Sequence, residues 1–158
     1  MDREQIQRVK SIIEKVGVFK GFNMTEAQQL IKLCRPQSYK RGEVVYTAGE
    51  PSSEMLILLQ GKLMATNASG TVLGDIQPRT TTGEMGVLTA YPRSATIVAV
   101  EASAGFVIGK TQLDNLMRSV AAVRMKVLEN MVKLLCERLM GANTQIESYA
   151  EKSREMGG

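Results

Sequence analysis

The sequence contains no histidine and no tryptophan, and the lack of histidine excludes several kinds of chemistry. A Ser-His-Asp triad cannot be assembled, and the usual histidine-bearing zinc sites are excluded too. Only two cysteines occur, Cys34 and Cys136, far apart and each in an apolar helical pattern without a CxxC motif. We therefore expect two buried free thiols, no disulfide framework and no metal site.

Long apolar runs are also missing. The first ten residues, MDREQIQRVK, do not contain the apolar core of a secretory signal peptide. No stretch approaches the roughly 18 apolar residues that a membrane span requires. The net charge is only +4, and the basic residues are dispersed along the chain. We therefore expect a cytoplasmic protein with no membrane partner and no direct nucleic-acid binding.

The chain does contain enough apolar residues for a core, 44 % of 158 residues, as expected for one ordinary domain. Residues 3–18 carry apolar side chains at helical spacing. The segment MTEAQQLIKLC predicts a second helix, with Thr25 as its cap and Gln28 completing a capping box. Pro36 ends this second helix, so residues 1–36 are predicted to form a helical lead-in.

From residue 37 the spacing of the apolar residues changes from that of a helix to that of short strands. Residues 37–110 are predicted to form about eight short strands separated by turns rich in glycine. Such close spacing predicts an antiparallel β-roll, resembling a jelly roll, and argues against a βαβ fold, so the predicted class is α+β. Six of these strands can be placed, at Glu43–Thr47, Glu54–Gln60, Lys62–Thr66 and Thr71–Ile76 and in the stretches SATIVAVEA and AGFVIG.

Residues 111–158 return to helical periodicity. A short helix is predicted from Thr111 and a long one over roughly residues 120–150, before a polar tail that we expect to fray. Apolar residues of the long helix form an a/d seam, as in a coiled coil. The stripe either packs on the roll along its whole length or, as we favour for its later part, forms a homodimer. The seam consists of Leu128, Val132, Leu135, Leu139, Ala142, Ile146 and Tyr149.

The stretch GEMGVLTAYPRSAT, residues 83–96, lies between two predicted strands. Gly83 and Gly86 predict a turn into one helical turn, where backbone N–H groups can approach an anion. Arg93, on the next strand, has a planar guanidinium suited to a phosphate, and Ser94 adds a hydroxyl. Glu84 can accept hydrogen bonds from sugar hydroxyls. From spacing alone, a salt bridge between Glu84 and Arg93 is an equally open interpretation.

This stretch resembles the phosphate-binding cassette of the cyclic-nucleotide-binding domain family, which includes catabolite activator proteins, cyclic-nucleotide-dependent kinases and gated channels. The resemblance covers roughly residues 18–140, through FKGFNMTEAQQLIKLC and YKRGEVVYTAGEPSSEMLILLQGKLMA. The sequence departs from the family pattern at two places. Thr82 replaces a phenylalanine before the cassette, and Pro78 is followed by Arg79 where the family often has glycine.

The resemblance implies roles for matching residues. Glu84 would accept from the ribose 2′-hydroxyl, and Arg93 and Ser94 would bind the cyclic phosphate. Thr96 would lie near a purine in the syn conformation. Arg138 would cap the base, unless it is simply a solvated arginine. The predicted ligand-binding residues are Gly83, Glu84, Met85, Gly86, Arg93, Ser94, Ala95, Thr96 and Arg138.

The resemblance also implies a function. Because Ser94, and not threonine, follows Arg93, cAMP is the expected ligand, with cGMP possible. No helix-turn-helix, kinase or channel segment follows the long helix, so we expect a sensory domain whose moving C-terminal helix signals to a downstream protein partner. We expect no enzyme activity, because no second carboxylate, histidine or metal cluster accompanies the cassette. The alternatives are a ligand-free dimerising scaffold and the sensory fragment of a longer transcription regulator.

Overall fold

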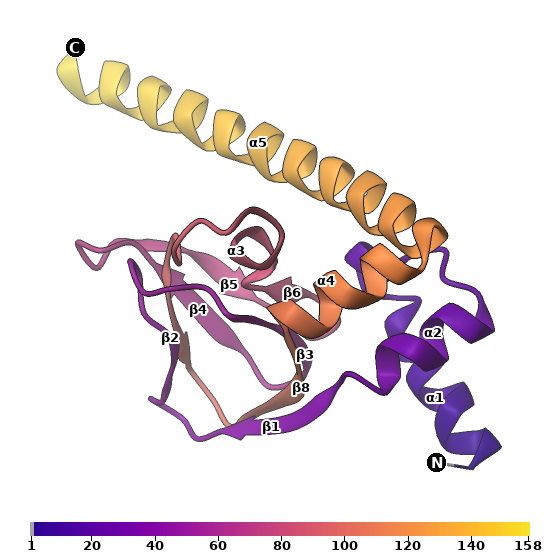
Figure 1. The fold of residues 1–158 in the computed structure, drawn as a ribbon. Helices are drawn as coiled ribbons and strands as arrows, with labels where there is room; N and C mark the ends of the chain where they lie inside the picture. Colours follow the sequence, from indigo (N-terminus) through magenta and orange to yellow (C-terminus); the bar gives the residue numbers. More distant parts are fainter. Residues whose placement is uncertain (1) are drawn as a thin grey trace.

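The computed structural model describes residues 2–158, which form an antiparallel roll of eight strands with helices packed against one side (Figure 1). This arrangement confirms the predicted α+β roll with N-terminal helices and a long C-terminal helix. The strands are β1 (Arg35–Tyr39), β2 (Val44–Tyr46), β3 (Glu54–Gln60), β4 (Leu63–Thr66), β5 (Val72–Ile76), β6 (Thr81–Thr82), β7 (Thr96–Ala99) and β8 (Ser103–Gly109). The helices are α1 (Arg3–Ile13), the 3₁₀ helix η1 (Gly17–Phe19), α2 (Met24–Ile31), α3 (Glu84–Thr89), α4 (Lys110–Ser119) and α5 (Ala121–Gly157).

The strands form two sheets, with orders β1-β8-β3-β6 and β2-β7-β4-β5. Strand β3 is buried on both faces, because one face meets the other sheet and the opposite face meets the helices. Met55 and Ile57 belong to the core on the helical side, whereas Leu56 and Leu58 belong to the core between the sheets. Since successive side chains of a strand point to opposite faces, a strand covered on both sides needs a continuous apolar run.

Strand β1 is missing from the predicted strands, because Pro36 reads as the end of the preceding helix. In the structure Pro36 lies inside β1, opposite Phe106 of β8. This strand is at the edge of its sheet and pairs only with β8. A proline is tolerated there because one side of an edge strand makes no ladder hydrogen bonds.

The predicted start of the second helix is wrong by two residues. Asn23, and not Thr25, is the N-cap of α2. The Asn23 side chain accepts a hydrogen bond from the Glu26 N–H at 2.9 Å, and the Glu26 carboxylate accepts from the Asn23 N–H at 2.9 Å. The capping box therefore uses Glu26 in place of Gln28.

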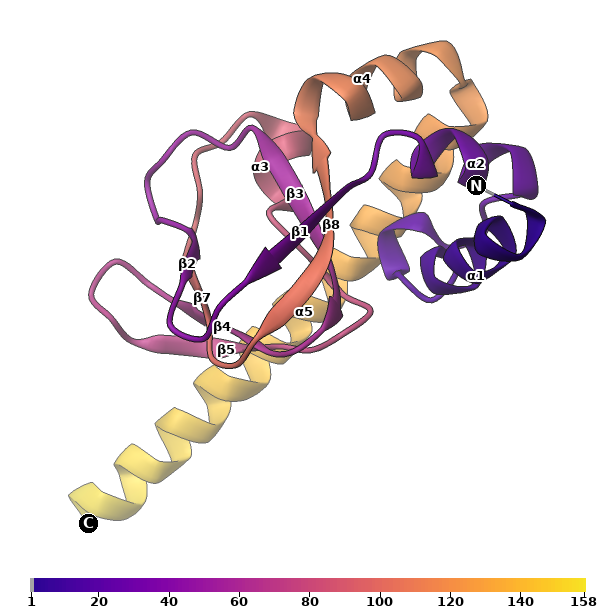
Figure 2. The same cartoon turned by 90° about the horizontal axis from the view of Figure 1, so that it is seen from below.

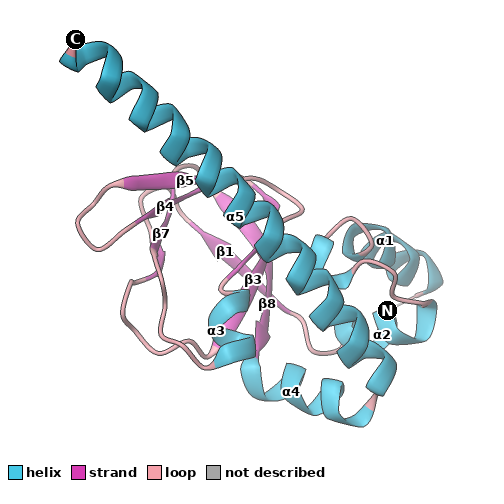
Figure 3. Ribbon diagram, turned by 90° about the horizontal axis from the view of Figure 1, so that it is seen from above, coloured by secondary structure: helices cyan, strands magenta, loops and turns pink. Residues whose placement is uncertain are grey.

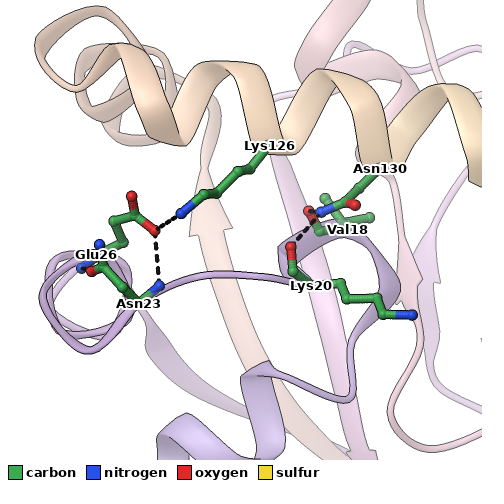
Figure 4. A network of polar contacts seen from close by, with 6 residues as sticks. All are labelled: Val18, Lys20, Asn23, Glu26, Lys126 and Asn130. Carbon is green, nitrogen blue, oxygen red and sulfur yellow. Dashed lines mark hydrogen bonds and ion pairs between the residues drawn. The ribbon is translucent and has the colours of Figure 1, made fainter.

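The first turns of α5 are attached to the N-terminal helices by two polar side chains (Figure 4). Lys126 donates to the buried Glu26 carboxylate at 2.6 Å. The Asn130 amide donates to the backbone carbonyls of Val18 within η1, at 3.0 Å, and of Lys20 directly after it, at 2.9 Å. Apolar residues of the same turns are buried in the helical core, namely Val123, Val127 and Met131.

Beyond Arg138, α5 leaves the body of the molecule, and Figures 2 and 3 show its last turns projecting beyond the sheets. The helix continues to Gly157, so the prediction that the polar tail frays is wrong. The seam residues do not pack on the roll along the whole length of the helix. Leu139 is 64 % exposed and Tyr149 is 69 % exposed. The chain therefore presents an apolar stripe that is not covered by its own domain.

The two cysteines differ from the prediction of two buried thiols. Cys34 is half-buried, and burial raises the pKa of its thiol to about 12. Cys136 is exposed on α5, because its apolar neighbours belong to the uncovered stripe. Within residues 2–158, no helix combines the length and the apolar character needed to cross a membrane.

Candidate functional site

The predicted cassette folds as a left-handed turn followed by one short helix, α3, as the glycine pattern predicts. Gly83 is the N-cap, with a φ of 84°, a region that favours glycine. A Cβ atom at Gly83 would also clash with the guanidinium of Arg93 and lie 3.0 Å from the Glu54 carbonyl. At Gly86 a Cβ atom would clash with the Ser52 side chain. Both glycines are therefore required for close packing around the cassette.

Glu84, the first residue of α3, is 1 % exposed. One carboxylate oxygen, Oε1, accepts a hydrogen bond from Nη1 of Arg138, which comes from α5. The other oxygen, Oε2, is buried and has no hydrogen-bond partner among residues 2–158. A buried carboxylate oxygen without a donor is costly, so this position favours a ligand that can donate a hydrogen bond.

Arg93 is 8 % exposed and lies in the loop before β7, not on the strand as predicted. Its backbone is fixed to the β2–β3 loop, since its N–H donates to the Glu50 carbonyl and its carbonyl accepts from Gly49, both at 2.8 Å. The guanidinium lies over the ring of Tyr46, with Cζ 3.5 Å from the ring centroid. Its Nη1 is buried without a hydrogen-bond partner in the described part of the chain.

The alternative of a salt bridge between Glu84 and Arg93 is wrong for this structure. Glu84 pairs with Arg138 instead, and no ion pair of the described residues includes Arg93. Arg138 is therefore not a freely solvated arginine, because its side chain is held by an ion pair with Glu84. Its half-exposed side chain reaches from α5 to the cassette carboxylate.

A cavity of about 770 Å³ is lined by the cassette, the β2-β7-β4-β5 sheet and α5. Pockets of this size accept a small organic ligand. Leu73 of β5 and Met85 of α3 contribute apolar wall, while Leu134 and Arg138 contribute the wall formed by α5. The predicted site residues that line this cavity are Gly83, Glu84, Met85, Gly86, Arg93, Ser94, Ala95 and Arg138.

Thr96 is the one predicted site residue that does not line the cavity. Its hydroxyl accepts a hydrogen bond from the backbone N–H of Ala48 at 3.0 Å, which ties β7 to the β2–β3 loop. The resemblance implies that Thr96 lies near a purine, but Thr96 is not part of the cavity wall in this structure.

The structure also places residues in the cavity wall that the sequence analysis misses as site residues, above all Tyr46 and Ser52. Tyr46 ends β2, and its apolar neighbours make it read as an ordinary core residue. Burial raises the pKa of its phenol, an effect that the positive charge of Arg93 only partly offsets. The phenol therefore stays neutral, and Arg93 remains an uncompensated cation.

Arg79 lies at the rim of the same cavity with a φ of 70°, the left-handed region that favours glycine. At the position where the resemblance leads one to expect glycine, Arg79 thus adopts a backbone conformation that favours glycine. Its N–H donates to the Leu58 carbonyl at 2.7 Å, which fixes the loop before β6. Within residues 2–158, no cluster of three or more acidic or cysteine side chains is arranged for a metal ion.

Comparison with known proteins agrees with this arrangement. The model of the family described as the cyclic nucleotide-binding domain matches residues 36–120, so the chain belongs to this family. The match includes the whole roll, the cassette and the first helix after β8.

Two curated relatives illustrate the range of proteins that contain similar sequences. The cAMP-dependent protein kinase regulatory subunit of Dictyostelium discoideum is 26 % identical over 98 residues, which are 58 % of this chain and 30 % of that protein. The CRP-like cAMP-activated global transcriptional regulator of Mycobacterium tuberculosis is 24 % identical over 139 residues, 85 % of this chain and 60 % of that protein. The chain thus spans less than two thirds of the length of either relative.

Solved structures share the fold at lower identity. A cyclic nucleotide-binding domain from Methylobacillus flagellatus matches 90 % of this chain and 83 % of its own, with a TM-score of 0.78 and 22 % identity. The regulatory domain of Toxoplasma gondii PKA, crystallised with cAMP, matches 73 % of this chain and 46 % of its own, with a TM-score of 0.67 and 18 % identity. These similarities establish the architecture around the cavity.

Proposed function

We propose that this chain is a regulatory domain that binds a cyclic nucleotide, with cAMP as its ligand, and signals through α5. One observation carries the proposal. A buried, unpaired guanidinium and a buried carboxylate with one unpaired oxygen line the same cavity, contributed by Arg93 and Glu84. This pair of groups complements a ligand that presents an anion beside a hydroxyl donor.

A cyclic nucleotide has these two groups at a fixed separation. Its phosphate would take the in-plane N–H donors of Arg93 and the hydroxyl of Ser94, and its ribose 2′-hydroxyl would donate to Glu84. A cyclic phosphate diester carries one negative charge, which matches the single buried cation of the cavity. The purine would then lie against the apolar wall formed by Leu73 and Met85.

Arg138 gives the ligand a route to α5. In the structure this side chain is the donor to Oε1 of Glu84. A ribose hydroxyl that donates to the same carboxylate would compete with Arg138 for it, and weaker hydrogen bonding to Arg138 would change the position of the second half of α5. The ligand can shift α5 only by its difference in affinity for the two positions.

The uncovered apolar stripe of α5 supports a homodimer, in which the two copies of α5 pair and their relative position changes with the ligand. Its seam residues are spaced as in a coiled coil, and those beyond Met131 are exposed or nearly so. Pairing with a second copy would bury the stripe, and a downstream protein would read the resulting position of the helices.

The test is calorimetric titration of the wild-type protein with cAMP and with cGMP, repeated on Arg93→Ala. We expect saturable binding that favours cAMP and that falls at least about 100-fold in the variant, because charge-assisted hydrogen bonds are lost. Arg41→Ala is the matched control, since Arg41 is exposed and outside the cavity.

Equal affinity of Arg93→Ala and wild type would contradict the assignment of the phosphate to Arg93. The absence of heat with either nucleotide, on folded protein shown to be free of co-purified ligand, would instead favour a ligand-free dimerising scaffold.

A further inference from the structure

The guanidinium of Arg93 is buried without the partner that a buried cation usually has. Burial of a charge is costly unless it is paired, and the described residues provide no carboxylate within ion-pair distance of Arg93. What the structure provides instead is an aromatic face. The ring of Tyr46 lies 3.5 Å from Cζ of Arg93, well inside the range of a cation–π contact.

We propose that Tyr46 is a positioning residue for the anion site, whose ring stacks on Arg93 and holds its guanidinium in the cavity wall with the N–H donors unpaired. The proposal rests on the function proposed above, since it concerns how the same arginine is prepared for a phosphate. The phenol hydroxyl has no part in it; the ring face does the positioning.

The geometry of the guanidinium explains why a ring suits this task better than a carboxylate. The N–H donors of an arginine lie in the plane of the group, whereas stacking uses only its face. A carboxylate partner would occupy two in-plane donors and neutralise the charge, so an arriving phosphate would have to displace it. Tyr46 stabilises the cation and leaves both its charge and its donors for the ligand.

The surrounding backbone is arranged around the stacked pair. Tyr46 ends β2 next to an irregularity in the pairing of β2 with β7, where the register shifts between Val44 and Tyr46. Such irregularities re-aim a side chain relative to a regular strand. Gly83 leaves the space that the pair fills, because a Cβ atom there would clash with Arg93 and lie 3.1 Å from the Tyr46 ring.

The first experiment measures cAMP affinity by calorimetry for Tyr46→Phe and Tyr46→Leu. Because phenylalanine keeps the ring, Tyr46→Phe should bind within about threefold of wild type. Tyr46→Leu removes the ring and should lose about tenfold or more in affinity. The matched control is Tyr39→Leu, which removes a second buried tyrosine from the same core but has no ring contact with a cation, and it should leave the affinity unchanged.

The second experiment needs no ligand and therefore separates this inference from the proposed function. Tyr46→Leu and Arg93→Ala are combined in a double-mutant cycle read by urea unfolding. The unfolding equilibrium constant should change at least about tenfold more for Tyr46→Leu in the wild-type background than in Arg93→Ala, where no cation is left to stabilise. Tyr39→Leu should cost the same in both backgrounds.

Several results would overturn the proposal. Wild-type affinity in Tyr46→Leu, or an additive cycle, would show that the ring does not act on Arg93. If Tyr46→Leu does not fold, Tyr46→Met replaces it, and loss of affinity in Tyr46→Phe would by itself exclude the ring as the cause. Failure of the wild-type protein to bind either nucleotide, together with strong coupling in the cycle, would contradict only the proposed ligand.

Discussion

Helix α5 pairs a basic side chain with each of two buried carboxylates, and the two carboxylates are held differently. Oε2 of Glu26 accepts from both Lys126 and the backbone N–H of Asn23, and Glu26 does not line the cavity described above. Glu84 receives only Arg138, faces the cavity and retains an oxygen without a donor. In the function proposed above, the Glu26–Lys126 pair is a fixed attachment, because no buried oxygen of Glu26 lacks a donor, whereas the Glu84–Arg138 pair is the one that a ligand would change.

This difference divides α5 into two parts. Its first turns are fixed by Lys126, by Asn130 and by buried apolar side chains, as Figure 4 shows for the polar contacts. After Arg138 the helix has no buried residue within its own domain. In the proposed function, a change at Glu84 would move the second part of α5 about this fixed first part.

The largest expected effect is on dimerisation, and it comes from placing a charge in the part of α5 beyond Arg138. Leu139→Asp would remove two leucines from the proposed dimer seam, about 3–6 kcal/mol per dimer at about 1.5–3 kcal/mol for each buried side chain. The dimer should therefore dissociate at concentrations where wild type is dimeric, as measured by sedimentation. Met140→Asp is the matched control, because Met140 is equally exposed but lies off the seam. Equal effects of the two variants would contradict a dimer through the seam.

The next effect separates the two carboxylates by stability. Glu26→Ala should lower the free energy of unfolding by about 2–3 kcal/mol, since a capping box and a charge-assisted hydrogen bond are lost together. Glu84→Ala should change it by less than about 0.5 kcal/mol, because it also removes a buried oxygen without a donor. Urea unfolding of the two variants measures both. A larger loss for Glu84→Ala would show that its ion pair is a structural attachment as well.

Much of this architecture can be predicted from the sequence, because local signals determine it. The roll follows from short apolar runs separated by turns, and the cassette turn follows from Gly83 and Gly86. The same local reasoning fails where two local signals compete. Thr25 reads as a cap although Asn23 is the residue that caps α2, and Pro36 reads as a helix end although it lies in an edge strand.

The site is less predictable than the fold, because its decisive contacts join distant parts of the chain. Arg138 reaches Glu84 across 54 positions, and Tyr46 at the end of β2 meets Arg93 in the loop before β7. No sequence pattern indicates a stacking partner for an arginine, since an aromatic residue at the end of an apolar strand reads as core. The scarcity of aromatic residues, 4 % of the chain, is the only signal that could have drawn attention to Tyr46.

A smaller effect tests the fixed part of α5 alone. Asn130→Ala removes the donor to the carbonyls of Val18 and Lys20 and should cost about 1–2 kcal/mol of unfolding free energy. The control is Asn143→Ala on the exposed half of the same helix, which should cost less than about 0.5 kcal/mol. Hydrogen exchange of the first turns of α5 should become faster only in Asn130→Ala. Identical protection in the two variants would argue against Asn130 as an attachment.

The smallest effect is a dependence of stability on pH that belongs to Glu26. Burial alone raises the pKa of this carboxyl, but the hydrogen bonds from Lys126 and Asn23 and the charge of Lys126 together outweigh it and lower the pKa below its ordinary value of 4.5. A carboxyl whose pKa is lower in the folded state stabilises the fold above its ordinary pKa, and this contribution disappears as the pH falls through the folded-state value.

Lys126→Met removes the largest of the interactions that lower the pKa of Glu26. The unfolding free energy of this variant should therefore decline less than that of wild type as the pH falls below 4.5. Lys152→Met, on the exposed end of α5, should follow the wild-type profile. Parallel profiles for Lys126→Met and wild type would mean that Lys126 does not determine the charge state of Glu26, and the two carboxylates would then differ only in their access to the cavity.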